Sequence, residues 1–550
     1  MRSKSPRCAV LRAATLFLPA ILFLSSAAWR VSRSGFPLPA VHDEFSYLLA
    51  ADTFAHGRLA NPSPPFPEFF ETIHVLVVPT YVSIYPPAQG LWLALGQVAF
   101  GHPWWGVLLS SVLFLVATGW AALAWLRPAW ALGAAFTAMG FVLGTNWSES
   151  YWGGSVAALG GALVLGAAGR IRKIWTAVEP EDRHPARTFV LAALWAAGAT
   201  MAFLARPYEG GLLLLLSAIE LGRLWLRMPS PWLQKRAELF RCLAAATPVC
   251  GAGLGFLLAC NQAATGSPLR MAYMEHARQY QIRRTFLWQK DRPEPSYRHA
   301  SIRDVYRKLV RRDLTARQRL AVNWRMFEGQ YGSIKMIGPG LAGAILWGAG
   351  AGLGWVTSMV FAGLGAVLMI VWINPHYYAP YAAFLAVAVA GGLSLWARLS
   401  FRGWSAAWPV VLLWVALLGS RFWWLTHRMP ERPEFSPQRA AVLRRLEALP
   451  GRHLVLVKYG PDHNWLNEWV YNCADLDGAK VLWARWHETE KLGAFLAHHR
   501  DRKAWLLEAD QPGTPLAVLA NVGDSRSVEA GAQSPEGAAY GTAVHPDPLF

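Results

Sequence analysis

The sequence predicts an α-helical polytopic membrane protein with a small α/β domain near its C-terminal end. Of the 550 residues, 54% are apolar and only 16% are charged, whereas an average soluble domain has about 25% charged residues. The apolar residues lie in runs of about 17–25, which match the hydrocarbon thickness of a bilayer. The 29 Trp are also far above usual usage. These observations exclude a soluble enzyme, a disordered chain and a fibrous repeat.

The first apolar run, which ends near Trp29, follows four basic residues between positions 2 and 12. It is longer than the h-region of a signal peptide, and no small-residue cleavage site follows it. We therefore expect a retained first helix with a cytoplasmic N-terminus, because basic flanks mark the cytoplasmic side. The Pro-rich stretch that follows, 30–102, then forms an outer loop.

Ten further apolar runs predict membrane spans and complete a transmembrane domain over 1–425. They cover roughly 103–126, 129–145, 151–169, 188–205, 208–226, 242–261, 336–354, 355–373, 377–396 and 405–425. The run 88–100 is too short to cross comfortably and is expected to lie at, or dip into, the interface. Eleven crossings place the basic groups near 127 and within 170–187, 223–241 and 398–402 in the cytoplasm, as the positive-inside rule requires. A full crossing by 88–100 would move all four groups outside.

Two regions are predicted to lie outside the membrane, both on the extracytoplasmic side. Residues 262–335 form an insert with 16 Lys and Arg against six Asp and Glu, a net charge of +10, and long loops are translocated regardless of charge. Residues 436–512 are expected to form a soluble α/β domain. In it, strand-like runs at 453–459, 480–486 and 503–509 alternate with helix-like runs at 463–472 and 488–499. This alternation predicts a parallel sheet, and 513–550 is expected to be a flexible tail.

The formal net charge of +18 comes from 52 Lys and Arg against 34 Asp and Glu. Because the basic residues lie in the short cytoplasmic loops and in the insert, we interpret them as a topology signal and as a contact with membrane lipids of negative charge. We expect no nucleic-acid partner. The five Cys show no disulfide or metal-ligand spacing.

Polar clusters from six segments fall on the extracytoplasmic face under this topology. They contain Asp43 with Glu44, Tyr85 before a Pro-Pro pair, Glu149, Arg206, Arg270, and His376 with Tyr378. Ionisable side chains are costly in lipid and usually have a partner or a function. Structural interpretations exist for some of them: Asp43 as a helix N-cap, Arg206 in a local pair with Glu209, and 374–380 as part of an aromatic belt. Their convergence on one face predicts a site.

The ordered set of motifs resembles the membrane glycosyltransferases of the GT-C fold, over about residues 1–400. The likeness is carried by an Asp-Glu pair after the first helix, a Tyr-Pro-Pro that closes the first outer loop, an acid in the second outer loop and a later Tyr-x-x-Pro helix start. The branch it resembles most contains protein O-mannosyltransferases and the lipid A aminoarabinose transferase. The resemblance implies transfer of a sugar, with inversion, from a polyprenyl-phosphate donor to a lipid, glycan or protein acceptor. The reaction would take place at the outer face of a bacterial inner membrane.

Carried over by position, the resemblance implies that Asp43 is the catalytic acid, with Glu44 beside it. Glu149 matches the acid of the second outer loop, and Tyr378 falls in the Tyr-x-x-Pro region. A carboxylate such as Asp43 can act as general base toward an acceptor hydroxyl. A divalent metal held by Asp43, Glu149 and either histidine of the outer segments, His74 or His276, is compatible with the spacing but not required by it.

One departure from the family concerns the donor phosphate. Members of the branch commonly have a Lys just before the Pro-Pro pair, where this chain has Ile84 and Tyr85. Binding of the phosphate then falls to Arg206 and Arg270, since Arg is always ionised and can grip two phosphate oxygens at once.

Two other functions fit part of the pattern. A transporter or flippase for an anionic lipid would use the same arginines, but such proteins usually show an internal repeat and broken helices at mid-membrane, and we see no repeat. A polymerase or ligase of polyprenyl-linked glycans would also use an outer-face site. In the C-terminal domain, 460–462 follows a strand where anions or sugars can bind. That domain lacks a G-x-G-x-x-G motif, so we expect a structural or acceptor-binding role for it.

Overall fold

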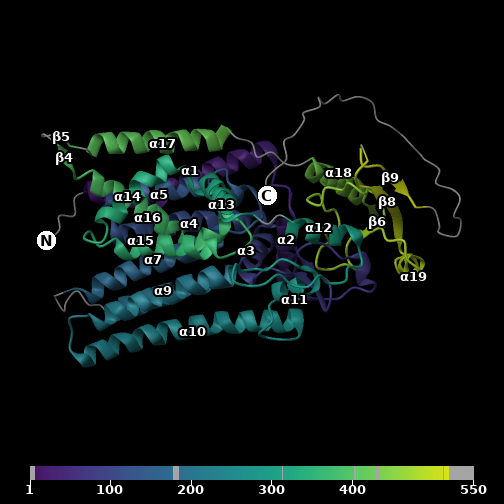
Figure 1. Ribbon diagram of the computed structural model, residues 1–550, viewed down its shortest axis with the longest axis horizontal. Coiled ribbons are helices and arrows are strands. Elements are labelled where there is room, and N and C mark those ends of the chain that lie inside the picture. The colour runs from purple at the N-terminus through teal and green to yellow at the C-terminus, as the bar shows by residue number, and fades with distance from the viewer. Residues whose placement is uncertain are drawn as a thin grey trace.

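The computed structural model describes residues 6–177, 185–311, 314–401, 404–405, 407–427, 434–511 and 513–519. Figure 1 shows two parts along the long axis, a bundle of long helices and a small sheet, with short outer segments between them. Most of the predicted tail, 520–550, lies outside the described residues, as does 178–184 within one of the predicted cytoplasmic loops.

The bundle contains the helices that coincide with the eleven predicted spans. They are α1 (Pro6–Ser34), α4 (Trp104–Trp125), α5 (Pro128–Val142), α7 (Ser155–Trp175), α8 (Pro185–Ala205), α9 (Pro207–Leu226), α10 (Trp232–Thr265), α14 (Ile334–Trp347), α15 (Gly354–Leu368), α16 (Ala382–Trp396) after the 3-10 helix η3 (Pro375–Tyr381), and α17 (Ala407–His427). Within the described ranges, seven helical segments are long and apolar enough to cross a membrane, and α5, α14 and α15 are shorter apolar helices. The chain is therefore an integral membrane protein.

Proline and glycine set several helix boundaries near the outer segments. Pro87 and Pro207 stand in the first turns of α3 (Pro87–Phe100) and α9, where a missing N–H costs nothing. Gly101 and Gly266 end α3 and α10 with φ of +76° and +75°, a conformation that favours glycine. The segment predicted to lie at the interface is thus a helix of 14 residues.

Close contact between small residues brings η3 against the bundle. A Cβ atom on Gly161 of α7 would lie 1.8 Å from the carbonyl oxygen of Pro380 in η3, so only glycine fits there. On the other face of α7, a Cβ on Gly160 would lie 2.5 Å from the carbonyl oxygen of Gly198 in α8. Such small-residue contacts are typical of helices that pack in membranes, and here they fix the backbone of the Tyr-rich η3.

Two of the connections predicted to be cytoplasmic share one end of the bundle. Figure 1 shows the link between α9 and α10, and the hairpin of β4 (Ser400–Phe401) and β5 (Trp404–Ser405), at the end remote from the C-terminal sheet. This arrangement is the one that the loop charges require, since both connections must lie on one side. Which side of the membrane it is stays a prediction.

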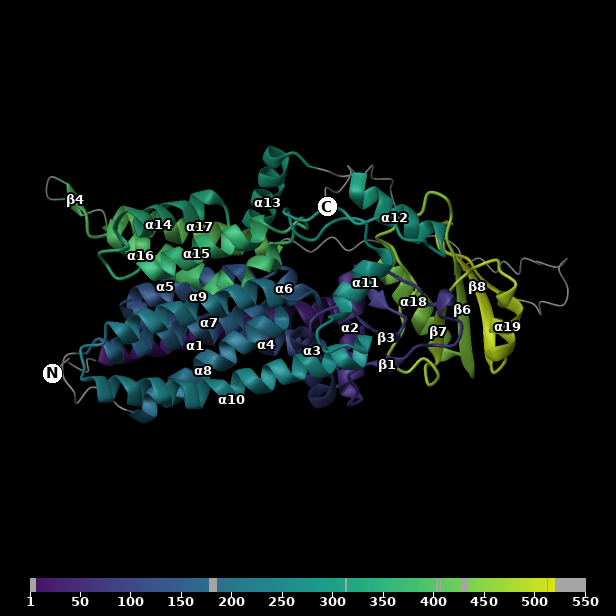
Figure 2. The ribbon, with the colours of Figure 1, turned by 60° about the horizontal axis from the view of Figure 1, so that its bottom comes forward.

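The outer loop and the insert form the layer between the bundle and the sheet. The outer loop contains α2 (His42–Ala55), β1 (Asn61–Pro62), η1 (Pro67–Phe69), β2 (Val75–Leu76) and β3 (Thr80–Ser83), with an antiparallel sheet of order β1-β3-β2. The insert contains α11 (Ala272–Tyr280), α12 (Ala300–Arg311) and α13 (Ala316–Tyr331). Figure 2 shows α11 and α12 between the bundle and the C-terminal sheet.

The C-terminal region consists of α18 (Phe435–Ala448), β6 (Arg452–Lys458), β7 (Val481–Arg485), α19 (Lys491–His498), β8 (Arg502–Glu508) and β9 (Leu516–Val518). The strand order is β7-β6-β8-β9, and β6 pairs in parallel with both β7 and β8 while β9 is antiparallel. The predicted parallel sheet is confirmed. β9 was not predicted as a strand, because it falls in the segment expected to be a flexible tail.

The helix predicted over 463–472 is wrong, because this segment has no helix. A side chain of α18 holds its backbone instead, and one of its own side chains binds β7. Arg439 of α18 donates to the carbonyl oxygens of Trp469 and Tyr471, at 3.1 Å and 2.8 Å, and the Asn472 amide exchanges bonds with the backbone of Trp483 in β7. These tertiary contacts override the local helical preference.

One apolar core joins the outer loop to the C-terminal region. Phe45 and Leu49 of α2 lie in the same buried cluster as Val455 and Leu456 of β6. Phe45 also stacks on Tyr471 with ring centroids 4.5 Å apart. Helix α2, which carries the first predicted site residues, is therefore packed between the bundle and the sheet.

Candidate active site

In the first turn of α2, the carboxylates of the adjacent Asp43 and Glu44 have different partners. Glu44 Oε2 accepts from the backbone N–H of Ala40 and Val41, at 2.7 Å and 3.2 Å, and Oε1 accepts from the N–H of Tyr151 at 3.0 Å. The Glu44 side chain is buried, and burial raises its pKa to about 7. Glu44 thus caps its own helix and holds the segment after α6 (Asn146–Glu149).

The carboxylate of Asp43 belongs to a three-residue cluster with Tyr85 and His74. The Tyr85 hydroxyl donates to Asp43 Oδ1 and also lies 3.1 Å from Nδ1 of His74, which is 3.7 Å from Asp43 Oδ2. Because the hydroxyl has only one proton, its contact with His74 requires the proton on Nδ1. The side chain of Asp43 is 17% exposed and that of His74 is 26% exposed, so both can meet a ligand.

The backbone around His74 and Tyr85 is firmly held. His74 has φ of +62°, which is uncommon for a residue other than glycine, and its carbonyl oxygen accepts from the Ser46 hydroxyl at 2.6 Å. The Tyr85 ring stacks on Tyr47 of α2, with centroids 4.4 Å apart. Burial lowers the pKa of His74, against the opposing effect of Asp43, so the neutral ring is favoured.

Arg206 lies in the break between α8 and α9 and carries an unused donor. Its guanidinium lies over the Tyr377 ring, 4.9 Å from the centroid. Its Nη2 atom is buried and has no hydrogen-bond partner among the described residues. No ion pair within 4 Å joins it to Glu209 in the described part of the chain, so the local pair that offered a structural interpretation is not formed.

Burial lowers the pKa of Arg206, but Tyr47, Glu209, Tyr377 and Tyr85 raise it, and the net direction is upward. These groups therefore lie close enough to act on the guanidinium. Tyr85, which is bonded to Asp43, is one of these groups.

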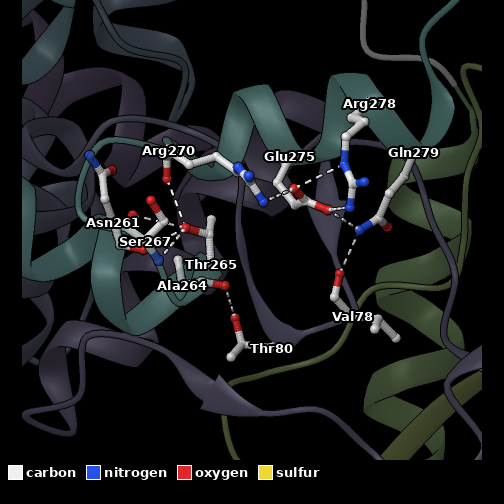
Figure 3. Close-up of polar contacts among 10 residues, drawn as sticks. All are labelled: Val78, Thr80, Asn261, Ala264, Thr265, Ser267, Arg270, Glu275, Arg278 and Gln279. Carbon is white, nitrogen blue, oxygen red and sulfur yellow. Dashed lines mark hydrogen bonds and ion pairs between the residues drawn. The ribbon is translucent and has the colours of Figure 1, made fainter.

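Arg270 and Glu149 are engaged in ion pairs of their own. Arg270 is half-exposed and lies 3.3 Å from Glu275, a carboxylate that it shares with Arg278 at 2.6 Å. Figure 3 shows this pair beside the contacts that tie the insert to the outer loop, in which Gln279 donates to the carbonyl oxygen of Val78. Glu149 Oε1 lies 3.7 Å from Nε of Arg30 at the end of α1.

The Tyr-x-x-Pro region places a different tyrosine at the site from the one predicted. Tyr378 is 1% exposed and its hydroxyl donates to the carbonyl oxygen of Val360 in α15, at 3.3 Å, so it belongs to the core of the bundle. The preceding residue, Tyr377, contacts Arg206 instead. His376 is buried, with its ring 4.9 Å from that of Trp152.

The residues predicted as metal ligands do not form a set. In the described ranges no group of three or more His, Cys, Asp and Glu side chains is placed to hold a metal ion. Asp43 and His74 are neighbours, whereas the ring centroids of His276 and His74 are 6.4 Å apart and Glu149 is paired with Arg30.

An apolar cavity of about 50 Å³ adjoins Tyr85 on the side of α10. Residues of α2, α3, α10 and the start of the insert line it, among them Phe54, Leu257, Met271 and Tyr273. The site thus combines a partly exposed carboxylate, a guanidinium with one unused donor among the described residues, and an apolar wall.

Sequence reasoning missed the role of two site residues. His74 was considered only as a metal ligand, because an isolated histidine in a Pro-rich loop gives no further signal. Tyr377 could not be separated from Tyr378, since neither the motif nor the spacing says which ring faces the bundle.

No protein-family model matches the chain, and no curated protein matches it. Solved structures similar to it include the apo oligosaccharyltransferase of Archaeoglobus fulgidus, at 12% identity and a TM-score of 0.47, covering 90% of this chain and 69% of that one. They also include ArnT from Cupriavidus metallidurans. Its complex with undecaprenyl phosphate matches at 13% identity and a TM-score of 0.48, over 92% of this chain and 93% of that one. Its apo state matches at 12% identity and 0.49, over 89% and 92%.

Because the identities are 11–13% and the TM-scores lie below 0.5, we base the function on the residues of the site.

Proposed function

We propose that the protein transfers a sugar from a polyprenyl-phosphate-linked donor to an acceptor hydroxyl at the extracytoplasmic membrane face, with inversion and with Asp43 as general base. The observation that carries this proposal is the Asp43–Tyr85–His74 cluster together with the buried Nη2 atom of Arg206, which has no hydrogen-bond partner among the described residues. A base and an anion-binding group are the two elements that such a transfer needs.

The acceptor hydroxyl is a weak nucleophile until its proton is removed. In the proposed step, the acceptor oxygen forms a bond to the anomeric carbon while its proton passes to Asp43, and the bond from that carbon to the phosphate oxygen breaks with its electron pair. The Tyr85 hydroxyl holds the carboxylate by donating to Oδ1, which leaves Oδ2 for the acceptor. A base within hydrogen-bond reach contributes about 10²–10⁴-fold to such a reaction.

Negative charge develops on the phosphate as it leaves. Arg206 meets this charge with a donor that no group among the described residues uses, and a guanidinium matches phosphate geometry in a bidentate manner. Ile84, where the resembled branch commonly has a Lys, is buried and apolar and cannot bind a phosphate. We therefore assign the binding of the donor phosphate to Arg206. The apolar cavity beside Tyr85 suits the first units of a prenyl chain.

Glu44 is not proposed as a second catalytic acid, since three backbone N–H groups already bind its carboxylate. We assign it the positioning of Asp43 through the cap of α2. Arg270, Glu149 and His376 remain proposed contacts of the donor or acceptor around this centre.

The proposed arrangement in the membrane follows from the loop charges. We place the N-terminus in the cytoplasm and the C-terminal domain, 436–512, outside a bacterial inner membrane. A reporter fused after residue 427 should then be active only on the extracytoplasmic side.

The test is Asp43→Asn in full-length protein in membranes, assayed with a radiolabelled polyprenyl-phosphate sugar. We expect transfer to fall by about 10²–10⁴-fold while the protein is inserted normally. Asp477→Asn, in an exposed acid of the C-terminal region, is the matched control and should keep full activity. Full transfer by Asp43→Asn would exclude Asp43 as the base, and donor flipping without transfer would favour a flippase.

A further inference from the structure

A cavity between the insert and the C-terminal sheet has no role in the reaction proposed above. It has a volume of about 510 Å³ and lies between α12 of the insert and the ends of β6 and β7. We propose that this cavity binds the acceptor through an anionic saccharide unit, one that carries a carboxylate or a phosphate. That the bound saccharide is the acceptor rests on the proposed function, whereas the binding of an anionic sugar can be tested by itself.

The position of the cavity in the sheet is one that suits ligands. It lies outside the carboxyl ends of the parallel strands β6 and β7, where Tyr459, Gly460 and Trp486 follow the strands. Open α/β sheets bind their ligands outside the carboxyl ends of the strands.

The charges around the cavity favour an anion. Four cationic side chains line it, Arg298, Lys308, Lys458 and Arg485, against two acids, Asp304 and Glu468. Both acids are paired with an arginine, Asp304 with Arg303 and Glu468 with Arg485. Lys308 and Lys458 have no hydrogen-bond or ion-pair partner among the described residues, so their ammonium groups are available to a ligand.

The aromatic side chains of the cavity suit a sugar ring. Trp465 and Trp486 line it together with Tyr459, and large aromatic rings present an apolar face with a polar edge. A cavity lined by such rings and a few charged groups is the common form of a small-molecule site. A saccharide with one negative charge combines the two features that this lining offers.

The wall of the cavity is already built. Arg485 donates to the carbonyl oxygen of Glu71 in the outer loop at 3.2 Å, to the hydroxyl of Ser301 in the insert at 3.2 Å, and to the carboxylate of Glu468. One buried guanidinium therefore ties the three segments that surround the cavity. Figures 1 and 2 both show α12 beside the sheet.

The inner end of the cavity reaches the residues next to the proposed base. Trp465 stacks on the ring of His42, with centroids 5.4 Å apart, and His42 directly precedes Asp43. Ile73, which also lines the cavity, directly precedes His74. A saccharide bound in this cavity would therefore contact residues that are adjacent in sequence to Asp43 and His74 or that stack on such a residue.

The experiment uses saturation-transfer NMR on the full-length protein in detergent, with glucuronate, glucose 6-phosphate and glucose as probes. We expect the saturation-transfer signal of glucuronate or of glucose 6-phosphate to exceed that of glucose at least fivefold. The stronger of these two signals identifies the anionic group. Lys308→Glu and Lys458→Glu should each reduce this signal at least fivefold, because each replaces a cation of the cavity by an anion. Both residues are exposed, so the changes should not disturb the core. Lys290→Glu, an exposed lysine of the insert outside the cavity, should leave it unchanged.

The outcomes separate this inference from the proposed reaction. Equal signals for glucose and the two anions, or wild-type binding by both lysine variants, would overturn the anionic site even if Asp43→Asn abolishes transfer. Conversely, a signal lost in Lys308→Glu together with normal transfer by Asp43→Asn would keep the site and overturn the reaction. If both proposals hold, Lys308→Glu raises the acceptor KM and leaves the donor KM as in the wild type.

Discussion

The surroundings of Arg485 and of Arg206 show two ways of burying an arginine at the boundary of the outer segments. At Arg485, all three guanidinium nitrogens donate to acceptors from three segments, and its carboxylate partner, Glu468, is equally buried. At Arg206, a buried Nη2 has no partner among the described residues, and the nearest acid in sequence does not pair with it. Buried polar groups are nearly always satisfied. From this difference we infer that Arg485 holds the fold, and we propose that Arg206 binds the donor phosphate.

The largest effect should come from breaking the satisfied region. Glu468→Gln leaves the buried Arg485 without an opposite charge, which typically costs about 3–5 kcal/mol. We expect a clear fall in the midpoint of thermal unfolding of the C-terminal region, followed by tryptophan fluorescence. Glu447→Gln, in an exposed acid of α18, should leave the midpoint unchanged. An unchanged midpoint in Glu468→Gln would show that the pair contributes nothing to stability.

Arg206 should behave in the opposite way. Its removal in Arg206→Ala leaves no protein acceptor unpaired, so we expect little change in unfolding but a 10- to 100-fold rise in the donor KM, the range for a hydrogen bond to a charged group. Arg270→Ala is the comparison, because Arg270 is half-exposed and already paired with Glu275, and should raise the donor KM by less. The reverse order of the two variants would transfer the phosphate-binding role to Arg270.

A smaller effect is expected at the residue that joins Asp43 to His74. Tyr85→Phe removes the hydroxyl that donates to Asp43 and keeps the ring that stacks on Tyr47. We expect kcat to fall about tenfold, since one hydrogen bond to a carboxylate is lost, with the donor KM nearly constant. Tyr208→Phe serves as the control and should keep the wild-type kcat. A kcat equal to the wild type would mean that the tyrosine does not orient the base.

The smallest effect concerns the pH dependence of stability at Glu44. Its pKa rises from 4.5 to about 7 on burial, so the folded chain binds more protons than the unfolded chain between these values. The contribution of Glu44 to stability is therefore full below pH 4.5 and is lost as the pH rises through 7. Glu44→Gln cannot titrate, and its unfolding midpoint should change less between pH 5 and pH 8 than that of the wild type. An identical change in both proteins would assign the pH dependence to other groups.

Much of the architecture could be predicted from the sequence, because apolar runs of sufficient length are stable in lipid as transmembrane helices. Asp43 and Tyr85 were both selected as site residues, and the structure joins them directly. What could not be predicted depends on contacts between distant segments. Glu44 turns back onto the N–H groups of its own helix start, a choice that requires Tyr151, which is 107 residues away. The segment 463–472 was predicted as a helix, but Arg439 binds its backbone and its own Asn472 binds β7, which hold it in another form.

The core shared by α2 and the C-terminal sheet has a consequence for the synthesis of the chain. His42 and Tyr471, which are 2.9 Å apart, are separated by 429 residues. At about 5–20 residues per second, roughly 20–90 s pass between the emergence of the first and of the second. During this interval the apolar face of α2 lacks its partner. A ribosome that stops before the last strands would therefore release a chain whose membrane helices are inserted while α2, which carries Asp43, is still unpacked. The exposed apolar face of α2 would then be a target for a quality-control protease.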